Sequence, residues 1–135
     1  MPLLLVRHAS AGDRATWRGD DRKRPLDDGG RHDAADLVER LAPFRIDAIL
    51  TSPYLRCVET VEPLARARDL EPDVHEELGE ELQMQDGVLL VRSLAEHDVV
   101  VCGHGGLESV VPSAPVWKKG DVFVLGPALE LLAVL

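Results

Sequence analysis

Residues 3–12 read LLLVRHASAG, and the rest of the chain is best understood from this stretch. Its first four residues are apolar, and an uninterrupted apolar run predicts a strand covered on both faces, as in an α/β sheet. Arg7 and His8 follow this run without a spacer. Ligands bind just beyond the carboxyl ends of the strands in such sheets. We therefore expect Arg7 and His8 to lie at a binding site, and their chemistry suits an anion.

Length and composition narrow the classes of protein to consider. The chain has 135 residues, which predicts a single domain, residues 1–135. Its formal net charge of -9 argues against a nucleic acid as partner. The first residues contain no basic leader, and their apolar run is too short to span a membrane. Cys57 and Cys102 lack a metal-ligand spacing, so we expect reduced thiols in a cytoplasmic protein.

Hydrophobic patterning predicts strands that alternate with helices. Beyond the first, strands are expected at 46–51, 71–74 and 98–102, with a closing pair at 122–125 and 129–134. Helices are expected around 34–41, 57–65 and 88–94, with a short one ending before Pro112.

Two local signals add detail to these elements. Ser52 and Pro53 predict a helix start, with a hydroxyl cap followed by proline at the first helical position. Segment 13–25 is highly charged and contains Gly and Pro, which predicts an ordered loop. We expect Trp17, in that loop, and Trp117 to be packing residues.

Charged and imidazole side chains follow three of the expected strands. Arg7 and His8 end the first, Arg56 lies one helical turn beyond the second, and His104 follows the strand at 98–102. If these strands are parallel neighbours, the four side chains meet at one mouth. Helix N-termini near Ser52 and His104 would add backbone N–H donors. Guanidinium groups bind phosphoryl oxygens bidentately, so the set predicts a phosphate pocket that requires no cofactor and no metal.

Structural explanations of the same residues remain open at this point. His8 and His104 could be core histidines satisfied by the backbone. Arg56 could pair with Glu59 or Glu62 on its own helix.

The chemistry available to His8 is nucleophilic. Neighbouring cations disfavour the imidazolium form, and a neutral ring nitrogen can form a covalent intermediate. Departure of most leaving groups also needs a proton donor. The acidic stretch after His75 offers Glu76, Glu77, Glu80 and Glu81, and spacing alone does not choose among them.

Four blocks of the chain resemble the histidine phosphatase superfamily, the phosphoglycerate mutase-like proteins. They are residues 7–9, 26–30, 52–60 and 103–106, in the order that the family has them. The small size and the Arg24-Pro25-Leu26 stretch resemble the branch typified by the SixA phosphohistidine phosphatase. The loop at 17–21 is also similar to the phosphatase-like half of some two-domain Nudix hydrolases.

The resemblance implies a three-layer αβα sandwich with a mostly parallel central sheet. It implies that His8 is the phosphorylated nucleophile and that Arg7, Arg56 and His104 complete the phosphate pocket. Glu80 matches the position of the proton donor in many relatives. Arg14 falls where mutase-like members contact the phosphate, so we expect it to bind substrate.

A short segment between Val74 and Asp98 leaves little room for a lid, which favours an open site. We therefore expect a phosphatase that forms a phosphohistidine on His8, acting on phosphohistidine in a protein. One alternative is a small phosphorylated metabolite or nucleotide, which the arginine-rich loop around Trp17 suggests. Another is a phosphate-binding module without turnover. The expected partner is thus a phosphorylated protein or small molecule.

Overall fold

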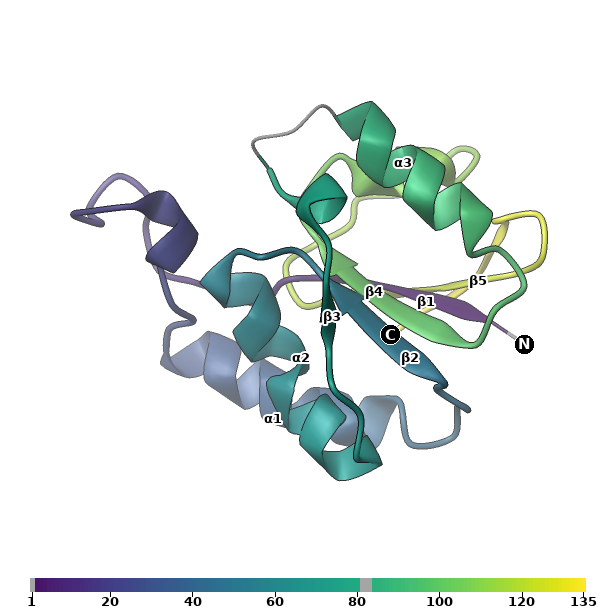
Figure 1. Ribbon diagram of the computed structural model, residues 1–135, viewed down its shortest axis with the longest axis horizontal. Helices are drawn as coiled ribbons and strands as arrows, with labels where there is room; N and C mark the ends of the chain where they lie inside the picture. The colour runs from purple at the N-terminus through teal and green to yellow at the C-terminus, as the bar shows by residue number, and fades with distance from the viewer. Residues whose placement is uncertain (1, 81–83) are drawn as a thin grey trace.

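A computed structural model describes residues 2–80 and 84–135 of the chain (Figure 1). Within these residues the strands form one six-stranded sheet in the order β3-β2-β4-β1-β5-β6. The strands are β1 (Leu3–Arg7), β2 (Ala48–Thr51), β3 (Asp73–Val74), β4 (Val99–Gly103), β5 (Val122–Leu125) and β6 (Leu131–Val134).

The sheet is mostly parallel, as predicted. β1 pairs with β4, β4 with β2, and β2 with β3, all in parallel. β5 runs antiparallel to β1, and β6 runs antiparallel to β5, so the two closing strands form the predicted pair. The expected strand at 71–74 is reduced to two residues. β1 lies inside the sheet, with a partner on each side.

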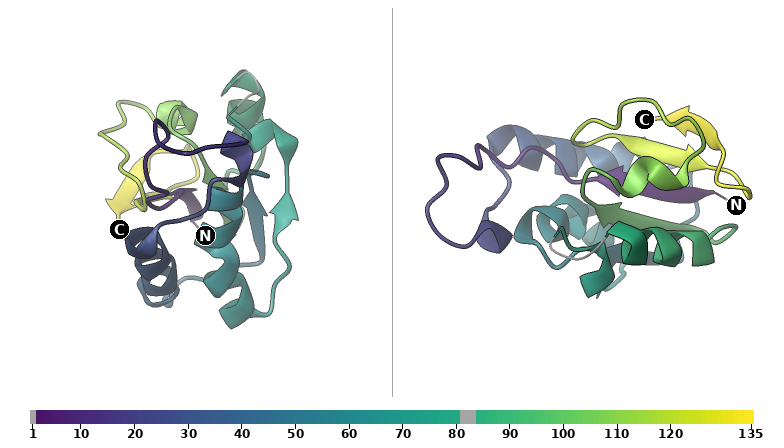
Figure 2. Two further views of the ribbon diagram at one scale, coloured as in Figure 1. Left: turned by 90° about the vertical axis from the view of Figure 1, so that its left-hand side faces the viewer. Right: turned by 90° about the horizontal axis from the view of Figure 1, so that it is seen from above.

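Helices cover both faces of the sheet, which confirms the three-layer arrangement. Helices α1 (Asp28–Arg40) and α2 (Leu55–Arg68) lie on one face, and α3 (Met84–Ser93) lies on the other (Figures 1 and 2). Alternate side chains of β1 point to opposite faces of the sheet. Leu4 and Val6 belong to the core under α1 and α2, and Leu3 and Leu5 belong to the core under α3. An apolar residue is therefore required at each of these positions.

Asp27 ties the start of α1 to the segment that follows β1. It is the N-cap residue, and its carboxylate accepts hydrogen bonds from the Gly30 amide (2.7 Å), the Ser10 hydroxyl (2.6 Å) and the Gly12 amide (3.0 Å). The Ser10 hydrogen bond is the main reason that the pKa of Asp27 lies below its ordinary value. These contacts fix where the loop after β1 leaves the sheet.

Gly30 allows α1 to approach the chain after β1 closely. A methyl group on Gly30 would lie 1.9 Å from the carbonyl oxygen of Ser10, so the backbone would have to move. We expect Gly30→Ala to lower the free energy of unfolding by about 1–3 kcal/mol, measured by urea denaturation. Gly29→Ala is the control, because its methyl group meets nothing nearer than the Asp27 Oδ1 atom at 3.5 Å. Equal losses in the two variants would contradict this explanation.

The predicted start of α2 was wrong by about two residues. The helix begins at Leu55, its N-cap residue is Tyr54, and no side chain caps it. Ser52 lies before the helix, where its Oγ atom accepts the Tyr54 amide at 3.2 Å and lies 2.8 Å from the His104 Nε2 atom. A contact with a residue distant in sequence therefore uses the hydroxyl that was expected to cap the helix.

Two further predictions differ from the structure. The short helix after β4 is a single 3-10 turn, η3 (Leu107–Val110), which is too short to supply a helix-dipole site near His104. Trp117 is buried as expected, whereas Trp17 is only partly covered, with 38% of its surface exposed. Among the described residues, no helix has the length and apolar character needed to cross a membrane.

Candidate active site

Three parallel strands bring their carboxyl ends to the same edge of the sheet. Arg7 of β1 is in register with Gly103 of β4, and Thr51 of β2 is in register with Cys102. The ladder continues one residue further, because the His8 amide donates to the Gly103 carbonyl at 3.1 Å. His8 and His104 consequently meet, with ring centroids 5.3 Å apart. The loop from residue 8 to 27, with the 3-10 turn η1 (Asp21–Lys23), extends beyond this edge (Figure 1).

His8 is held with one ring nitrogen bonded and the other free for chemistry. Its Nδ1 atom lies 2.8 Å from the Ala9 carbonyl oxygen, which only accepts, so Nδ1 carries the proton. Nε2 then carries the lone pair. His8 is 4% exposed, and burial is the main reason that its pKa falls from 6.5 to about 3. The nearby His104, Arg56 and Arg7 lower it further. The imidazole is therefore neutral and oriented, which is the state in which a histidine can act as a nucleophile.

The depressed pKa of His8 predicts the pH dependence of its charge. Between pH 4 and 7 we expect the His8 imidazole to remain neutral, because its pKa lies at about 3. Histidine ring resonances followed by NMR during a pH titration measure this directly. For the same reason, any acidic limb of kcat/KM that is due to His8 should lie near pH 3. A His8 resonance that shifts around pH 6.5 would contradict the assignment.

The same shift makes stability depend on pH in a defined direction. Between pH 3 and 6.5 the unfolded chain binds a proton at His8 that the folded protein does not bind. Stability therefore rises with pH across this window and falls as the pH is lowered. Relative to His8→Asn, we expect the free energy of unfolding of the wild-type protein to fall by at most about 1.4 kcal/mol for each unit by which the pH is lowered in this window.

Arg56 is fully buried, and its guanidinium contacts the loop that extends beyond the sheet. Nη1 donates to the Asp21 carbonyl oxygen (2.9 Å), and Nη2 contacts the Asp21 carboxylate (3.1 Å) and the Glu80 carboxylate (3.5 Å). The Arg56 Cζ atom lies over the Tyr54 ring, 4.7 Å from the centroid of that ring. Arg56 thus joins α2, the loop and Glu80 at one point.

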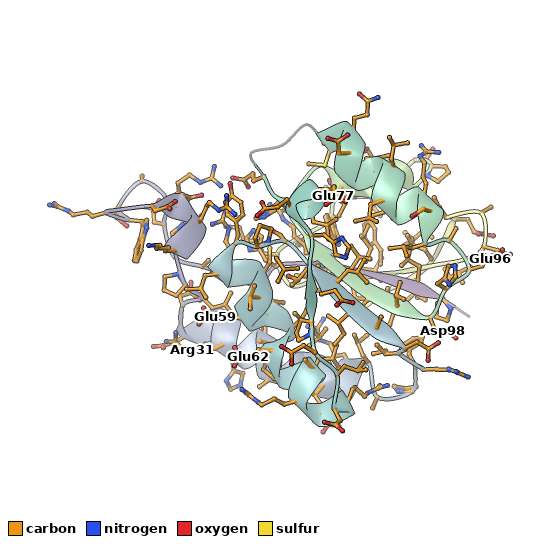
Figure 3. The ribbon with its side chains drawn as sticks, viewed as in Figure 1. Arg31, Glu59, Glu62, Glu77, Glu96 and Asp98 are labelled. Atoms are coloured by element: carbon orange, nitrogen blue, oxygen red, sulfur yellow. The ribbon has the colours of Figure 1, made fainter. Side chains whose placement is uncertain are left out.

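The expected alternative partners of Arg56 are engaged elsewhere. Glu59 accepts the Leu26 amide at 2.9 Å, and Glu62 pairs with Arg66 at 2.9 Å. Both glutamates lie along α2, on the side near Arg31 (Figure 3). Pairing of Arg56 with its own helix, one of the two structural explanations considered above, is therefore wrong.

Arg7 reaches the site from the end of β1. Its Nη1 donates to the Trp117 carbonyl oxygen at 2.7 Å, and its guanidinium lies against the backbone of Gly105. A methyl group on Gly105 would come within 3.2 Å of Nη2. Within the described residues, the Nε atoms of Arg7 and Arg56 and the Nδ1 atom of His104 are buried without a hydrogen-bond partner. Buried donors of this kind are suited to an oxyanion.

A cavity of about 380 Å³ lies in front of these groups. Most of its lining residues are charged; the whole set is Arg7, His8, Gly12, Asp13, Arg14, Arg24, Glu80 and Lys119. Arg56 and His104 are almost completely buried and are not among the lining residues, but both contact Glu80, which is one of them. The cavity is therefore a polar depression with an imidazole at its base.

Among the described residues of the acidic stretch, Glu80 is the glutamate that lines the cavity. Its carboxylate lies 2.6 Å from Arg14 Nη2 and 3.4 Å from His104 Nδ1. Glu76 instead pairs with Arg22 at 3.3 Å, and Glu77 lies 4.0 Å from His75. Glu81, the remaining candidate, lies outside the described residues. Geometry thus separates Glu80 from the other described glutamates, which spacing could not do.

Arg14 lines the same cavity from the loop and is largely exposed. Besides Glu80, it contacts Asp21 at 3.7 Å. Asp21 bridges Arg14, Arg24 and Arg56, and its hydrogen bond with Arg24 and the charge of Arg56 lower its pKa despite the opposing effect of burial. The loop is therefore fastened to the site through charges.

Three charged residues at the site were not identified from the sequence. Arg24 is buried, donates to the Ala11 carbonyl oxygen (2.6 Å) and pairs with Asp21 (3.0 Å). Lys119 reaches the cavity because β5 runs antiparallel to β1, which brings the start of β5 to the carboxyl end of β1. The high charge density of segment 13–25 could have pointed to Asp21 and Arg24 as site residues. No feature of the sequence pointed to Lys119. Across residues 2–80 and 84–135, no group of His, Cys, Asp or Glu is arranged to hold a metal ion.

Comparison with known proteins identifies the family of this chain. Residues 3–87 match the model of the histidine phosphatase superfamily, branch 1. A curated relative, the 8-oxo-(d)GTP phosphatase of Mycolicibacterium smegmatis, is 37% identical over 122 residues. The match covers 85% of this chain but only 36% of the relative, so the chain spans about a third of that protein's length.

Solved structures share the fold at low sequence identity. The protein histidine phosphatase SixA, solved with tungstate, has a TM-score of 0.80 at 20% identity, over 100% of this chain and 96% of that one. A mycobacterial glucosyl-3-phosphoglycerate phosphatase, solved with VO3, has a TM-score of 0.71 at 18% identity, over 93% and 90% of the two chains. The family model covers well over half of the chain. On this basis, the chain belongs to the histidine phosphatase superfamily, branch 1.

Proposed function

We propose that this chain is a phosphatase that transfers a phosphoryl group to the Nε2 atom of His8 and then to water. The observation that carries the proposal is the state of His8. Its Nδ1 proton is held by the Ala9 carbonyl, its Nε2 lone pair is free, and its depressed pKa keeps it neutral. The cations that surround it suit a phosphoryl dianion.

The reaction has two displacements at phosphorus. In the first, Nε2 of His8 forms a bond to phosphorus as the bond to the leaving group breaks. In the second, a water oxygen attacks the phosphohistidine and the P–N bond breaks, releasing phosphate. Arg7, Arg56 and the imidazole of His104 stabilise the charge on the equatorial oxygens during both steps.

Glu80 is the proposed proton donor to the leaving group and the acceptor of a proton from water. In the described structure its carboxylate is paired with Arg14 and lies near Arg56. A bound phosphoryl dianion would compete for the same guanidinium groups. The role assigned to Glu80 requires a protonated carboxyl at the moment when the leaving group departs.

The leading substrate class is phosphohistidine in a protein. The cavity opens at the surface, with the exposed side chains of Arg14 and Lys119 at its edge. An exposed phosphoryl group on a folded partner could enter it without opening a lid.

Transfer of labelled phosphate tests this function directly. The enzyme is mixed with a ³²P-phosphohistidine protein and, separately, with a panel of small phosphoesters, quenched in alkali and digested. We expect acid-labile label on the peptide that contains His8, followed by release of phosphate. Label on a different residue, or hydrolysis without any labelled enzyme, would overturn the mechanism. Turnover of small phosphoesters alone would reverse the order of the substrate classes.

A nucleotide is the second candidate substrate, and the position of Trp17 favours it. The exposed indole is fixed by a hydrogen bond from Nε1 to the Asp20 carbonyl oxygen (3.0 Å). It lines a cleft of about 240 Å³ whose walls share Gly12, Asp13 and Arg24 with the phosphate cavity. A flat base could lie against it. The relative from Mycolicibacterium smegmatis carries the name of a nucleotide phosphatase.

Substitution of Trp17 separates the two classes. If a base stacks on it, we expect Trp17→Ala to raise KM for a nucleoside diphosphate by about 10-fold, because such stacking contributes about 1–3 kcal/mol. Trp17→Phe should retain most of the affinity. The activity of both variants toward p-nitrophenyl phosphate, which has no nucleobase, should stay within about 2-fold of wild type. Unchanged KM for the nucleotide in Trp17→Ala would remove this role.

A further inference from the structure

His104 is buried, and its two ring nitrogens face different surroundings. Nε2 lies 2.8 Å from the Ser52 Oγ atom and 3.5 Å from the Cys57 Sγ atom, and neither residue lines the cavity. Nδ1 lies 3.4 Å from the Glu80 carboxylate, which lines the cavity. Within the described part of the chain, Nδ1 has no hydrogen-bond partner. The ring therefore connects the buried side of the site with its reacting side.

The hydrogen bonds of Ser52 decide which ring nitrogen carries the proton. The Tyr54 amide lies 3.2 Å from Oγ and can only donate, so Oγ accepts there. The hydroxyl proton then needs an acceptor, because Ser52 is completely buried. The His104 Nε2 atom is a good acceptor at 2.8 Å, whereas the Cys57 sulfur, which also contacts Ser52, is a weak one. If Nε2 accepts this proton, the proton of a neutral His104 lies on Nδ1.

The opposite tautomer is unfavourable for two reasons. With the proton on Nε2, Ser52 Oγ would accept two hydrogen bonds, and its own proton would be left with the Cys57 sulfur, a weak acceptor. Nδ1 would also present a lone pair to the Glu80 carboxylate at 3.4 Å and to any phosphoryl oxygen in the cavity. Both costs disappear when Nδ1 carries the proton.

We propose that Ser52 is a positioning residue that fixes His104 as the neutral tautomer protonated on Nδ1. In this state the imidazole presents one N–H donor toward the phosphoryl site, and Ser52 never contacts the substrate. The inference rests on the proposed function in one respect, namely that the Nδ1–H donor of His104 binds a phosphoryl group. The tautomer itself is a property of the protein without substrate.

The tautomer can be measured without any activity assay. Protein labelled with ¹⁵N-histidine is studied by NMR through the couplings between ring nitrogens and ring protons, which distinguish an N–H nitrogen from an imine nitrogen. His104→Gln identifies the resonance. We expect Nδ1–H and an imine Nε2 for His104 in the wild-type protein at pH 7. An Nε2–H tautomer, or an imidazolium with both nitrogens protonated, would overturn the proposal.

Variants at Ser52 and Cys57 test which group sets the tautomer. Ser52→Thr keeps the hydroxyl and should keep the Nδ1–H state. Ser52→Ala should shift His104 toward a mixture of tautomers, and kcat for a small phosphoester should fall by about 10- to 100-fold. Cys57→Ala removes the other neighbour of Nε2 and should leave the Nδ1–H state unchanged. An unchanged tautomer in a folded Ser52→Ala protein, or a changed one in Cys57→Ala, would assign the role away from Ser52.

The readouts separate this inference from the proposed function. If His104 shows the Nδ1–H state that depends on Ser52 but the wild-type protein has no phosphatase activity, the proposed function fails and the positioning role stands. If activity is present and the tautomer does not depend on Ser52, the reverse holds.

Discussion

Replacing His8 with alanine is expected to abolish phosphoryl transfer, with kcat/KM for a small phosphoester lowered by at least about 10³-fold. The variant lacks the only atom assigned to attack phosphorus, so neither displacement can begin. Residual hydrolysis would come from the cations that still surround the cavity. Release of inorganic phosphate, followed together with ³²P labelling of the protein, measures both effects in one experiment.

The controls for this variant are two exposed histidines. His32→Ala and His97→Ala each remove an exposed imidazole that does not line the cavity, and both should leave kcat/KM unchanged. Circular dichroism and thermal unfolding establish that the His8→Ala protein is folded. Hydrolysis at the wild-type rate in folded His8→Ala would eliminate the covalent mechanism. A wild-type protein that binds phosphate but shows no turnover would instead support the alternative of a binding module.

The predictable part of this fold depends on apolar runs. We expected the strands at 3–7, 48–51 and 99–103 and the helices α1 and α2. Continuous burial and helical periodicity can be recognised directly in the sequence. Once three parallel strands are placed, the meeting of His8 and His104 at their carboxyl ends follows from the topology. Their roles in catalysis remain a prediction.

The parts that could not be predicted depend on contacts between distant residues. Ser52 carries a strong capping signal, but its hydroxyl contacts a histidine 52 positions away. Asp21 contacts Arg56 across 35 positions, and hydrophobic patterning carries no information about such a pair. Lys119 enters the site only because β5 is antiparallel. Trp17 lies in a loop, where the exposure of an aromatic side chain depends on the path of the backbone.

Arg56→Ala is expected to be the second most damaging change, lowering kcat/KM by about 10²- to 10³-fold. The variant removes the buried guanidinium that contacts Asp21 and the cavity-lining Glu80, so the charge of the transition state loses a fixed donor. Its effect on folding should be smaller, about 1–3 kcal/mol in the free energy of unfolding. The reason is that Asp21 remains paired with Arg24 and is partly exposed, so no isolated buried charge is left.

Two further variants distinguish the geometry of Arg56 from its charge. Arg56→Lys keeps a cation but cannot contact both the carbonyl and the carboxylate of Asp21 as the planar guanidinium does. It should therefore recover less than about a tenth of the activity lost in Arg56→Ala. Arg66→Ala is the control on the same helix, since Arg66 is exposed and pairs only with Glu62 among the ion pairs described. Full activity in Arg56→Lys would show that Arg56 acts as a simple positive charge, and that its fixed orientation against Asp21 contributes nothing to the reaction.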